Sequence, residues 1–279
     1  MKIKEIMSGN PIVVEAPGTR KDAIRVLARH NVSGAPVVKA GTKKLVGVVT
    51  RNDLFEKLDE DQLALIMSSE PFTIEANEDI AVAAKYLHEN RIHGLPVVTK
   101  EKELVGIVSP LDILGTIAKD EKAVVDDYMT KNCVPIYEET PISLAMAIIS
   151  ITDVNALPVL NAEGSLVGVV TDGDILQVSH IREGIAQSEL GMGDDEDSWT
   201  WEGVRDTMRL YYATSHIKLP DVTVKEVMVR NVVSVFRKNS ISEAAIKMRK
   251  NNITQLPVVD ENNKLVSMIY DTDLLRALI

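Results

Sequence analysis

One short apolar pattern is written four times along the chain, and its spacing defines the repeating unit of the fold. The first copy reads VSGAPVV over residues 32–38, and its proline recurs at Pro36, Pro96, Pro158 and Pro257. A second marker is a methionine that recurs at Met7, Met67, Met129 and Met228. Both markers are spaced by 60, 62 and 99 residues. Their agreement predicts a repeat of about 60 residues, with an insertion of roughly 38 residues between the third and fourth copies.

Each copy contains the same order of predicted elements, β-α-β-β-α. A short strand is followed by a capped helix, then by two strands joined by a short turn, then by a second helix. Thr19 stands three residues before Asp22, the spacing of a capping box, and Pro141 follows Thr140, as at the first position of a helix. A unit of this size buries little surface alone, so we expect the units to pair, sheet against sheet.

A second motif, Gly-x-x-Thr/Ser-x-x-Asp, ends the last strand of each unit. It reads GVVTRND from Gly47 to Asp53, and returns as GIVSPLD, GVVTDGD and the altered SMIYDTD. Free N–H groups at such a strand-to-helix corner favour an anion such as phosphate. The hydroxyl adds a donor, and the carboxylate accepts hydrogen bonds from a ribose diol. Gly47 would let the backbone lie close to a flat ring. The motif therefore predicts a nucleoside-phosphate site.

The four copies differ in charge. Arg51 adds a cation beside Thr50, which favours phosphate. In the third copy Asp172 stands beside Asp174, and two carboxylates in one pocket would repel phosphate and suit a positively charged ligand. In the fourth copy Tyr270 replaces the hydroxyl residue; its ring either blocks the pocket or stacks on a base, and blocking is favoured.

The candidate ligand-binding residues come from these four corners and from the start of one strand. They are Thr50, Arg51, Asp53, His93, Ser109, Asp112, Thr171, Asp172, Asp174, Tyr270 and Asp273. Thr and Asp at the start of a helix are also an ordinary N-cap pair, and capping is compatible with binding. The positions that match His93 in the other repeats carry no charge: they are Ser33, Asn155 and Thr254.

These motifs resemble the cystathionine-β-synthase (CBS) domain, and four copies resemble two tandem pairs, or Bateman modules. Similar layouts occur in the γ subunit of AMP-activated protein kinase and in stand-alone archaeal four-CBS proteins. The resemblance implies an α/β protein with modules at 1–118 and 119–279 in one disc-like body. It also implies adenosyl ligands between paired repeats, with the motif on ribose and phosphate and the adenine against apolar strand residues. By the same resemblance His93 would contact phosphate bound in the partner repeat; the alternative is a surface histidine.

The repeat boundaries leave one segment unexplained. The predicted divisions are repeats at 1–57, 58–118, 119–178 and 222–279, with an insertion at 179–221. The insertion has 4 basic and 9 acidic residues, half of the net charge of −10, and both tryptophans. Its GDDEDS stretch is predicted to be an exposed loop and helix start, and residues 201–217 an amphipathic helix. The segment is expected to pack against its own module; a lid over the pocket or a docking surface is the alternative.

Composition excludes several functional classes. A pI near 5.1 argues against a nucleic-acid or anionic-membrane surface, which needs a basic face. A single cysteine, Cys133, fits a reducing cytosol. No apolar run reaches the roughly 18 residues of a membrane span, and residues 1–10 lack the apolar stretch of a signal peptide, so a cytoplasmic location is expected. HExxH, Gly-x-Ser-x-Gly and P-loop motifs are all missing from the sequence, so no catalysis is predicted.

The sequence therefore predicts a non-catalytic sensor of adenosyl ligands. Module 1 is expected to bind AMP, ADP or ATP, and module 2 S-adenosylmethionine or methylthioadenosine. Ligand would stabilise one arrangement of the modules, which an unidentified regulated protein would prefer; a homodimer is left open. The alternatives are a structural scaffold with vestigial sites and an enzyme acting on a nucleotide.

Overall fold

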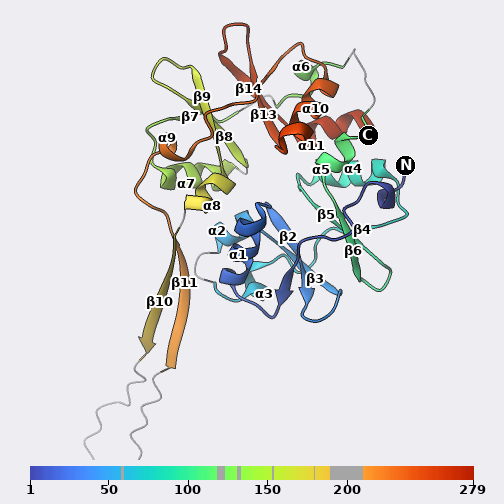
Figure 1. Ribbon diagram of the computed structural model, residues 1–279, viewed down its shortest axis with the longest axis vertical. Helices are drawn as coiled ribbons and strands as arrows, with labels where there is room; N and C mark the ends of the chain where they lie inside the picture. The colour runs from blue at the N-terminus through green and yellow to red at the C-terminus, as the bar shows by residue number, and fades with distance from the viewer. Residues whose placement is uncertain (58–59, 118–122, 131–132, 153, 179, 189–209) are drawn as a thin grey trace, which may run out of the picture.

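The computed structural model describes residues 1–57, 60–117, 123–130, 133–152, 154–178, 180–188 and 210–279 (Figure 1). Repeat 1 contains η1 (Ile3–Glu5), β1 (Val14–Ala16), α1 (Arg20–His30), β2 (Gly34–Lys39), β3 (Leu45–Thr50) and α2 (Arg51–Glu56). Repeat 2 contains α3 (Leu63–Ile66), β4 (Ile74–Glu75), α4 (Ile80–Glu89), β5 (Leu95–Val98), β6 (Leu104–Val108) and α5 (Pro110–Leu114).

The second half of the chain repeats this order. Repeat 3 contains α6 (Val125–Tyr128), β7 (Ile136–Tyr137), α7 (Ile142–Thr152), β8 (Ala156–Leu160), β9 (Leu166–Thr171) and α8 (Asp172–Val178). Repeat 4 contains α9 (Val224–Val227), β12 (Val235–Phe236), α10 (Ile241–Asn251), β13 (Gln255–Val259), β14 (Leu265–Tyr270), α11 (Asp271–Leu274) and η2 (Leu275–Leu278).

Every repeat has a three-stranded sheet with the same topology. The first strand is parallel to the second, and the second is antiparallel to the third. The intervening helix makes the parallel crossover possible. The predicted β-α-β-β-α order is confirmed, as is the capping box at Thr19, whose hydroxyl oxygen accepts from the amide of Asp22.

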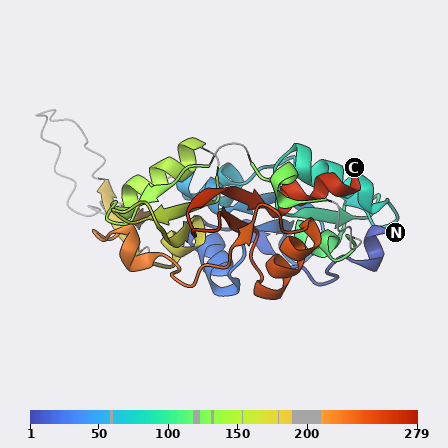
Figure 2. The same cartoon turned by 90° about the horizontal axis from the view of Figure 1, so that it is seen from above.

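The four repeats lie around a common centre and form a flattened body. Figure 1 views this body face on, with one repeat in each quadrant, and Figure 2 shows how thin it is from the side. Within module 1 the two sheets meet through a small apolar cluster of Val38, Leu45, Val98 and Leu104. The predicted packing of sheet against sheet is confirmed for this module.

The two large hydrophobic cores join repeats from different modules. In the first core Leu27 and Leu54 of repeat 1 pack in one cluster with Leu157 and Ile175 of repeat 3, and all four side chains are fully buried. The second core joins repeats 2 and 4 in the same way. Neither module therefore encloses its own core, and an isolated module would expose apolar surface to water.

Paired repeats also exchange the segments that precede their first strands. Met67 lies against Gly47 of repeat 1, where an added Cβ would be 2.7 Å from its sulfur, and Met7 lies against Gly106 of repeat 2. Met228 meets Gly168 in the same way. The expectation that Gly47 makes room for a ligand ring is wrong, because the space is filled by methionine. In repeat 4 the glycine is replaced by Ser267, whose hydroxyl donates to the carbonyl of Thr130 at 2.5 Å.

The insertion contains two antiparallel strands, β10 (His180–Ser188) and β11 (Leu210–Lys218), paired from His180↔Lys218 to Ser188↔Leu210. The predicted helix over residues 201–217 is wrong for the part described from Leu210 onward. The stretch LYYATSHI is rich in aromatic and β-branched residues, which favour a strand. The remainder of that predicted helix, the GDDEDS stretch and both tryptophans lie outside the described residues. No helix in the described ranges is long and apolar enough to cross a membrane.

Candidate ligand-binding site

The four strand-to-helix corners share one hydrogen-bond pattern. At the first corner the amide and the hydroxyl of Thr50 both donate to Oδ2 of Asp53, at 2.8 and 2.7 Å. The corners at 109–112 and 171–174 repeat these two bonds with the same distances. At the fourth corner only the amide of Tyr270 donates to Asp273, at 3.1 Å. The capping role is thus confirmed at three corners and reduced at the fourth.

Capping uses one oxygen of each carboxylate. Oδ1 of Asp53 makes no hydrogen bond within the part of the chain that the structure describes, and the side chain is half-buried. A carboxylate held by its cap with one oxygen still available is pre-oriented to accept from a hydroxyl group. This geometry leaves Asp53 able to serve both roles.

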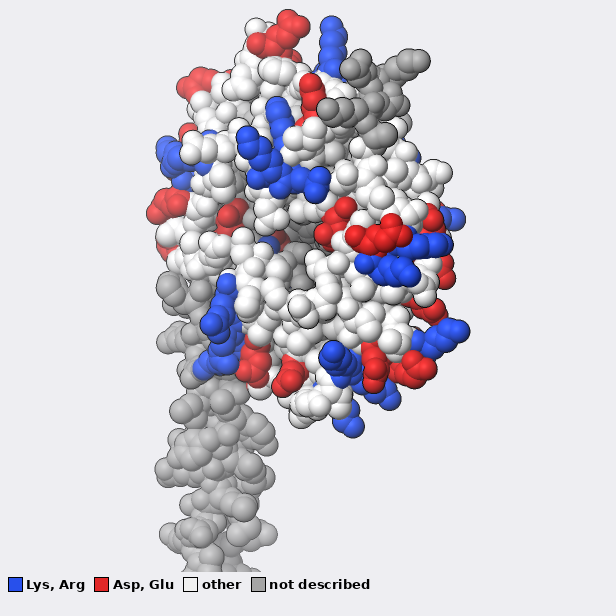
Figure 3. All heavy atoms as spheres, turned by 45° about the vertical axis from the view of Figure 1, so that its right-hand side comes forward, with Lys and Arg blue, Asp and Glu red and all other residues white. Residues whose placement is uncertain are grey.

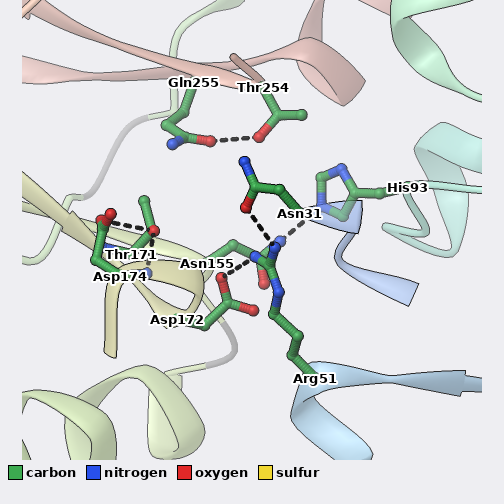
Figure 4. Close-up of polar contacts among 9 residues, drawn as sticks. All are labelled: Asn31, Arg51, His93, Asn155, Thr171, Asp172, Asp174, Thr254 and Gln255. Atoms are coloured by element: carbon green, nitrogen blue, oxygen red, sulfur yellow. Dashed lines mark hydrogen bonds and ion pairs between the residues drawn. The ribbon is translucent and has the colours of Figure 1, made fainter. Parts of the chain in front are cut away.

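Arg51, the first residue of α2, points to the centre of the body rather than to solvent (Figure 4). Its Nη1 lies 3.2 Å from Oδ1 of Asp172, and its Nη2 donates to Oδ1 of Asn31 at 3.3 Å. Asp172 is the first residue of α8 in the other module. The expectation that Asp172 and Asp174 present two carboxylates to one pocket is corrected, because Asp172 pairs with Arg51, which is distant in sequence.

His93 reaches the same centre from the segment just before β5. Its Nε2 is 2.7 Å from Nδ2 of Asn155, and its Nδ1 is 3.3 Å from Oδ1 of Asp271. If the amide of Asn155 donates, Nε2 accepts and the ring proton sits on Nδ1, facing the carboxylate. Asp271 is fully buried. The surface-histidine alternative is wrong, since only 20% of the His93 side chain is exposed.

We call these six residues the central polar cluster: Asn31, Arg51, His93, Asn155, Asp172 and Asp271. Sequence analysis did not single out Asn31 or Asp271. Asp271 occupies the same position in its repeat as Arg51 and Asp172 do in theirs. Alignment of the repeats could therefore have identified Asp271 as a candidate residue. Asn31 ends α1 in the left-handed conformation, with φ of 50°, a position that favours asparagine.

Burial sets the electrostatics of the acidic corners. Burial raises the pKa of Asp172, and the neighbouring Arg51 partly offsets this rise. Burial also raises the pKa of Asp273 and raises that of Tyr270 to about 12, so Tyr270 is a neutral phenol at physiological pH. Within the described ranges no group of three or more His, Cys, Asp or Glu side chains is arranged to hold a metal ion.

An open cleft of about 600 Å³ lies beside the second corner, lined by residues of repeats 1, 2 and 4. Residues from η1, from α5 and the turn after it, and from the end of α10 line it, among them Asp112, Thr116 and Arg249. Figure 3 brings that side of the molecule forward and shows charged groups of both signs around a hollow. Asp112, which is half-buried, lines this open cleft.

Comparisons with known proteins agree with this architecture. The family model described as CBS domain matches residues 3–60, 63–119, 125–181 and 224–279. MJ1225 of Methanocaldococcus jannaschii is 24% identical over 300 aligned residues, which cover 99% of this chain and 98% of that protein.

Two solved structures match over the whole length of both chains. The crystal structure of MJ1225, which is described as a proposed archaeal homologue of γ-AMPK, matches with a TM-score of 0.78 and 22% identity. An uncharacterised conserved protein from Pyrococcus horikoshii matches with a TM-score of 0.64 and 25% identity. The four repeats, their shared corners and these matches lead to one conclusion: the chain belongs to the CBS-domain family and carries four CBS repeats arranged as two Bateman modules.

Proposed function

We propose that this protein binds adenosyl ligands between paired CBS repeats and passes their occupancy to a partner protein, without catalysing a reaction. One observation carries the proposal: corners from different repeats converge on a central cluster that contains Arg51 and His93. A ligand at a corner would have its ribose near the capped carboxylate and its anionic end toward that cluster.

In module 1 the proposed ligands are AMP, ADP and ATP. Asp53 would accept from the ribose hydroxyls, and Thr50 and Arg51 would bind phosphate, with His93 from the paired repeat. The available Oδ1 of Asp53 supports the first role. Nε of Arg51, which is buried and makes no hydrogen bond within the described residues, supports the second.

Asp53→Asn separates binding from capping. Asp53 is the third helical residue of a capping box whose N-cap is Thr50, and the amide oxygen of asparagine can accept the same bonds from Thr50, so the corner should stay folded. Its amide presents NH2 where the carboxylate presented an acceptor, so the ribose contact should be lost. We expect AMP affinity to fall about ten- to a hundredfold, as for loss of a charged hydrogen bond. Isothermal titration calorimetry on the full chain measures this.

Glu56→Gln, one turn further along α2, is the matched control and should leave AMP affinity unchanged. Equal AMP affinity in the wild type and a folded Asp53→Asn variant would mean that the corner is only a cap. If the wild type binds no member of an adenosyl panel, the scaffold with vestigial sites becomes the better description.

In module 2 the proposed ligand is S-adenosylmethionine or methylthioadenosine. The helices α8 and α11 begin with Asp172 and Asp271, and the corner carboxylates Asp174 and Asp273 add to them. Arg51 offsets only one of these four charges. S-adenosylmethionine carries a sulfonium, an ammonium and one carboxylate, so an acidic corner suits it better than it suits a triphosphate.

This preference is expected to appear as tighter binding of S-adenosylmethionine than of ATP at one class of site. Calorimetry must use the full chain, because the hydrophobic cores cross the module boundary. Saturating AMP first would occupy module 1 and leave module 2 to be titrated. Tighter binding of ATP in that second titration would contradict the charge argument.

A further inference from the structure

We propose that Asp172 competes with the ligand's phosphate for Arg51, so that binding of a phosphate-bearing ligand weakens a contact between the two modules. The inference rests on the proposed function of module 1 and names its regulation. Asp271, which faces His93, is proposed to compete in the same way at the second pair.

The Arg51–Asp172 ion pair and the His93–Asp271 contact both cross the boundary between modules. Arg51 begins α2 in module 1, and Asp172 begins α8 in module 2. His93 lies two residues before β5 in module 1, and Asp271 begins α11 in module 2. Module 1 thus supplies the basic member of each pair, and module 2 supplies the acidic member. Anything that draws Arg51 away from Asp172 acts directly on how the modules meet.

The Arg51–Asp172 pair is buried and closely packed. Only 10% of the Arg51 side chain and 11% of the Asp172 side chain are exposed. The guanidinium lies so near the first turn of α8 that a Cβ added to Gly173 would be 2.5 Å from Nη1. Glycine at this position is what allows Arg51 to reach Asp172.

The hydrogen bonding of the cluster is incomplete. The two amino groups of Arg51 are engaged by Asp172 and Asn31, while its Nε makes no hydrogen bond within the described residues. The same is true of Oδ2 of Asp271. A phosphate bound at the Thr50 corner could use Nε directly, but a bidentate contact requires an amino group as well. Each amino group still has a second N–H, so the phosphate can bond beside both partners, but its negative charge then shares one guanidinium with the charge of Asp172.

The partner that a bound phosphate displaces from Arg51 should be Asp172. Two anions on one buried guanidinium repel each other, whereas the neutral amide of Asn31 does not repel phosphate. The strength of the contact between α2 and α8 would then depend on whether the ligand carries a phosphate, and not on its adenosine part. AMP would loosen this contact, and adenosine would leave it in place.

Asp172→Asn tests the competition, because it removes the charge and keeps the volume and an acceptor for Arg51. On the full chain, we expect calorimetry to show AMP binding about tenfold more tightly to the variant than to the wild type, with adenosine affinity unchanged. Glu163→Gln, in the exposed β8–β9 turn, removes the same charge outside the central polar cluster and should change neither affinity. Asp271→Asn should also raise AMP affinity, and it replaces Asp172→Asn in the test if that variant does not fold.

The comparison of AMP with adenosine separates competition from a purely structural role, which would change both affinities together. Unchanged or weaker AMP binding in the folded variants would overturn the inference while leaving the proposed function intact, provided that the wild type binds AMP. An equal gain for adenosine would overturn it too. If the wild type binds neither compound, the proposed function and this inference both fail.

Discussion

Replacing Arg51 by alanine is expected to lower the free energy of unfolding by about 3–5 kcal/mol, because it leaves a buried carboxylate without its partner. Asp172 is 8% exposed and has no other basic side chain within ion-pair distance among the described residues. Chemical denaturation of the full chain measures the loss. Arg51→Ala combined with Asp172→Asn should be more stable than Arg51→Ala alone, since the uncompensated charge is removed.

The deficit of Arg51→Ala should depend on pH. Burial already raises the pKa of Asp172, and removal of the guanidinium raises it further. A group whose pKa is higher in the folded than in the unfolded chain favours folding below the unfolded value and loses that contribution as pH rises through the folded value. The variant should therefore be most deficient near about pH 7 and recover toward about pH 5. A deficit that is the same at both pH values would contradict this origin.

Replacing Arg20 by alanine is expected to cost about 3–4 kcal/mol of stability, through unpaired carbonyl groups and a cavity. Arg20 is fully buried at the start of α1 and donates to the carbonyls of Leu54, Lys57 and Glu60. These bonds hold the end of α2 and the linker that follows it against the start of α1. Thermal and chemical unfolding of the full chain measure the effect.

Isoleucine is the informative second substitution at this position. Ile80, Ile142 and Ile241 begin the equivalent helices of the other repeats. Arg20→Ile would restore apolar packing and leave the carbonyls unpaired, so it should recover only part of the loss. Arg29→Ala, on the exposed side of the same helix, should change stability by less than about 0.5 kcal/mol. A loss at Arg20 no larger than at Arg29 would show that the carbonyls find other partners.

Local features of the fold followed from the sequence because their determinants are neighbours in the chain. The Thr19 cap and the Thr50–Asp53 pair involve residues three apart, and the strand order followed from a pattern repeated four times. Such signals are contained within a single repeat. They needed no knowledge of what each repeat would contact.

Contacts between repeats could not be predicted from one sequence. Arg51 and Asp172 are 121 residues apart, and each was interpreted only within its own corner. Gly47 was assigned to a ligand for the same reason, although its neighbour is Met67 of the paired repeat. Gly47 and Met67 each belong to a pattern that recurs along the sequence. Which residue each one contacts depends on how the repeats assemble. The helix wrongly predicted over residues 201–217 failed differently, because the strand over its described part is set by pairing with β10.

The cores shared between modules also govern the order in which the protein can fold during synthesis. The first core begins at Val14 and is closed by Met228, and the second extends from Ile3 to Leu275. Domains usually fold as units as they leave the ribosome, from the N-terminus onward. Here the first two repeats must wait, with one apolar face uncovered, until most of the remaining chain has been made. Nascent chains of this protein should therefore depend more on chaperones than those of proteins whose domains each enclose their own core.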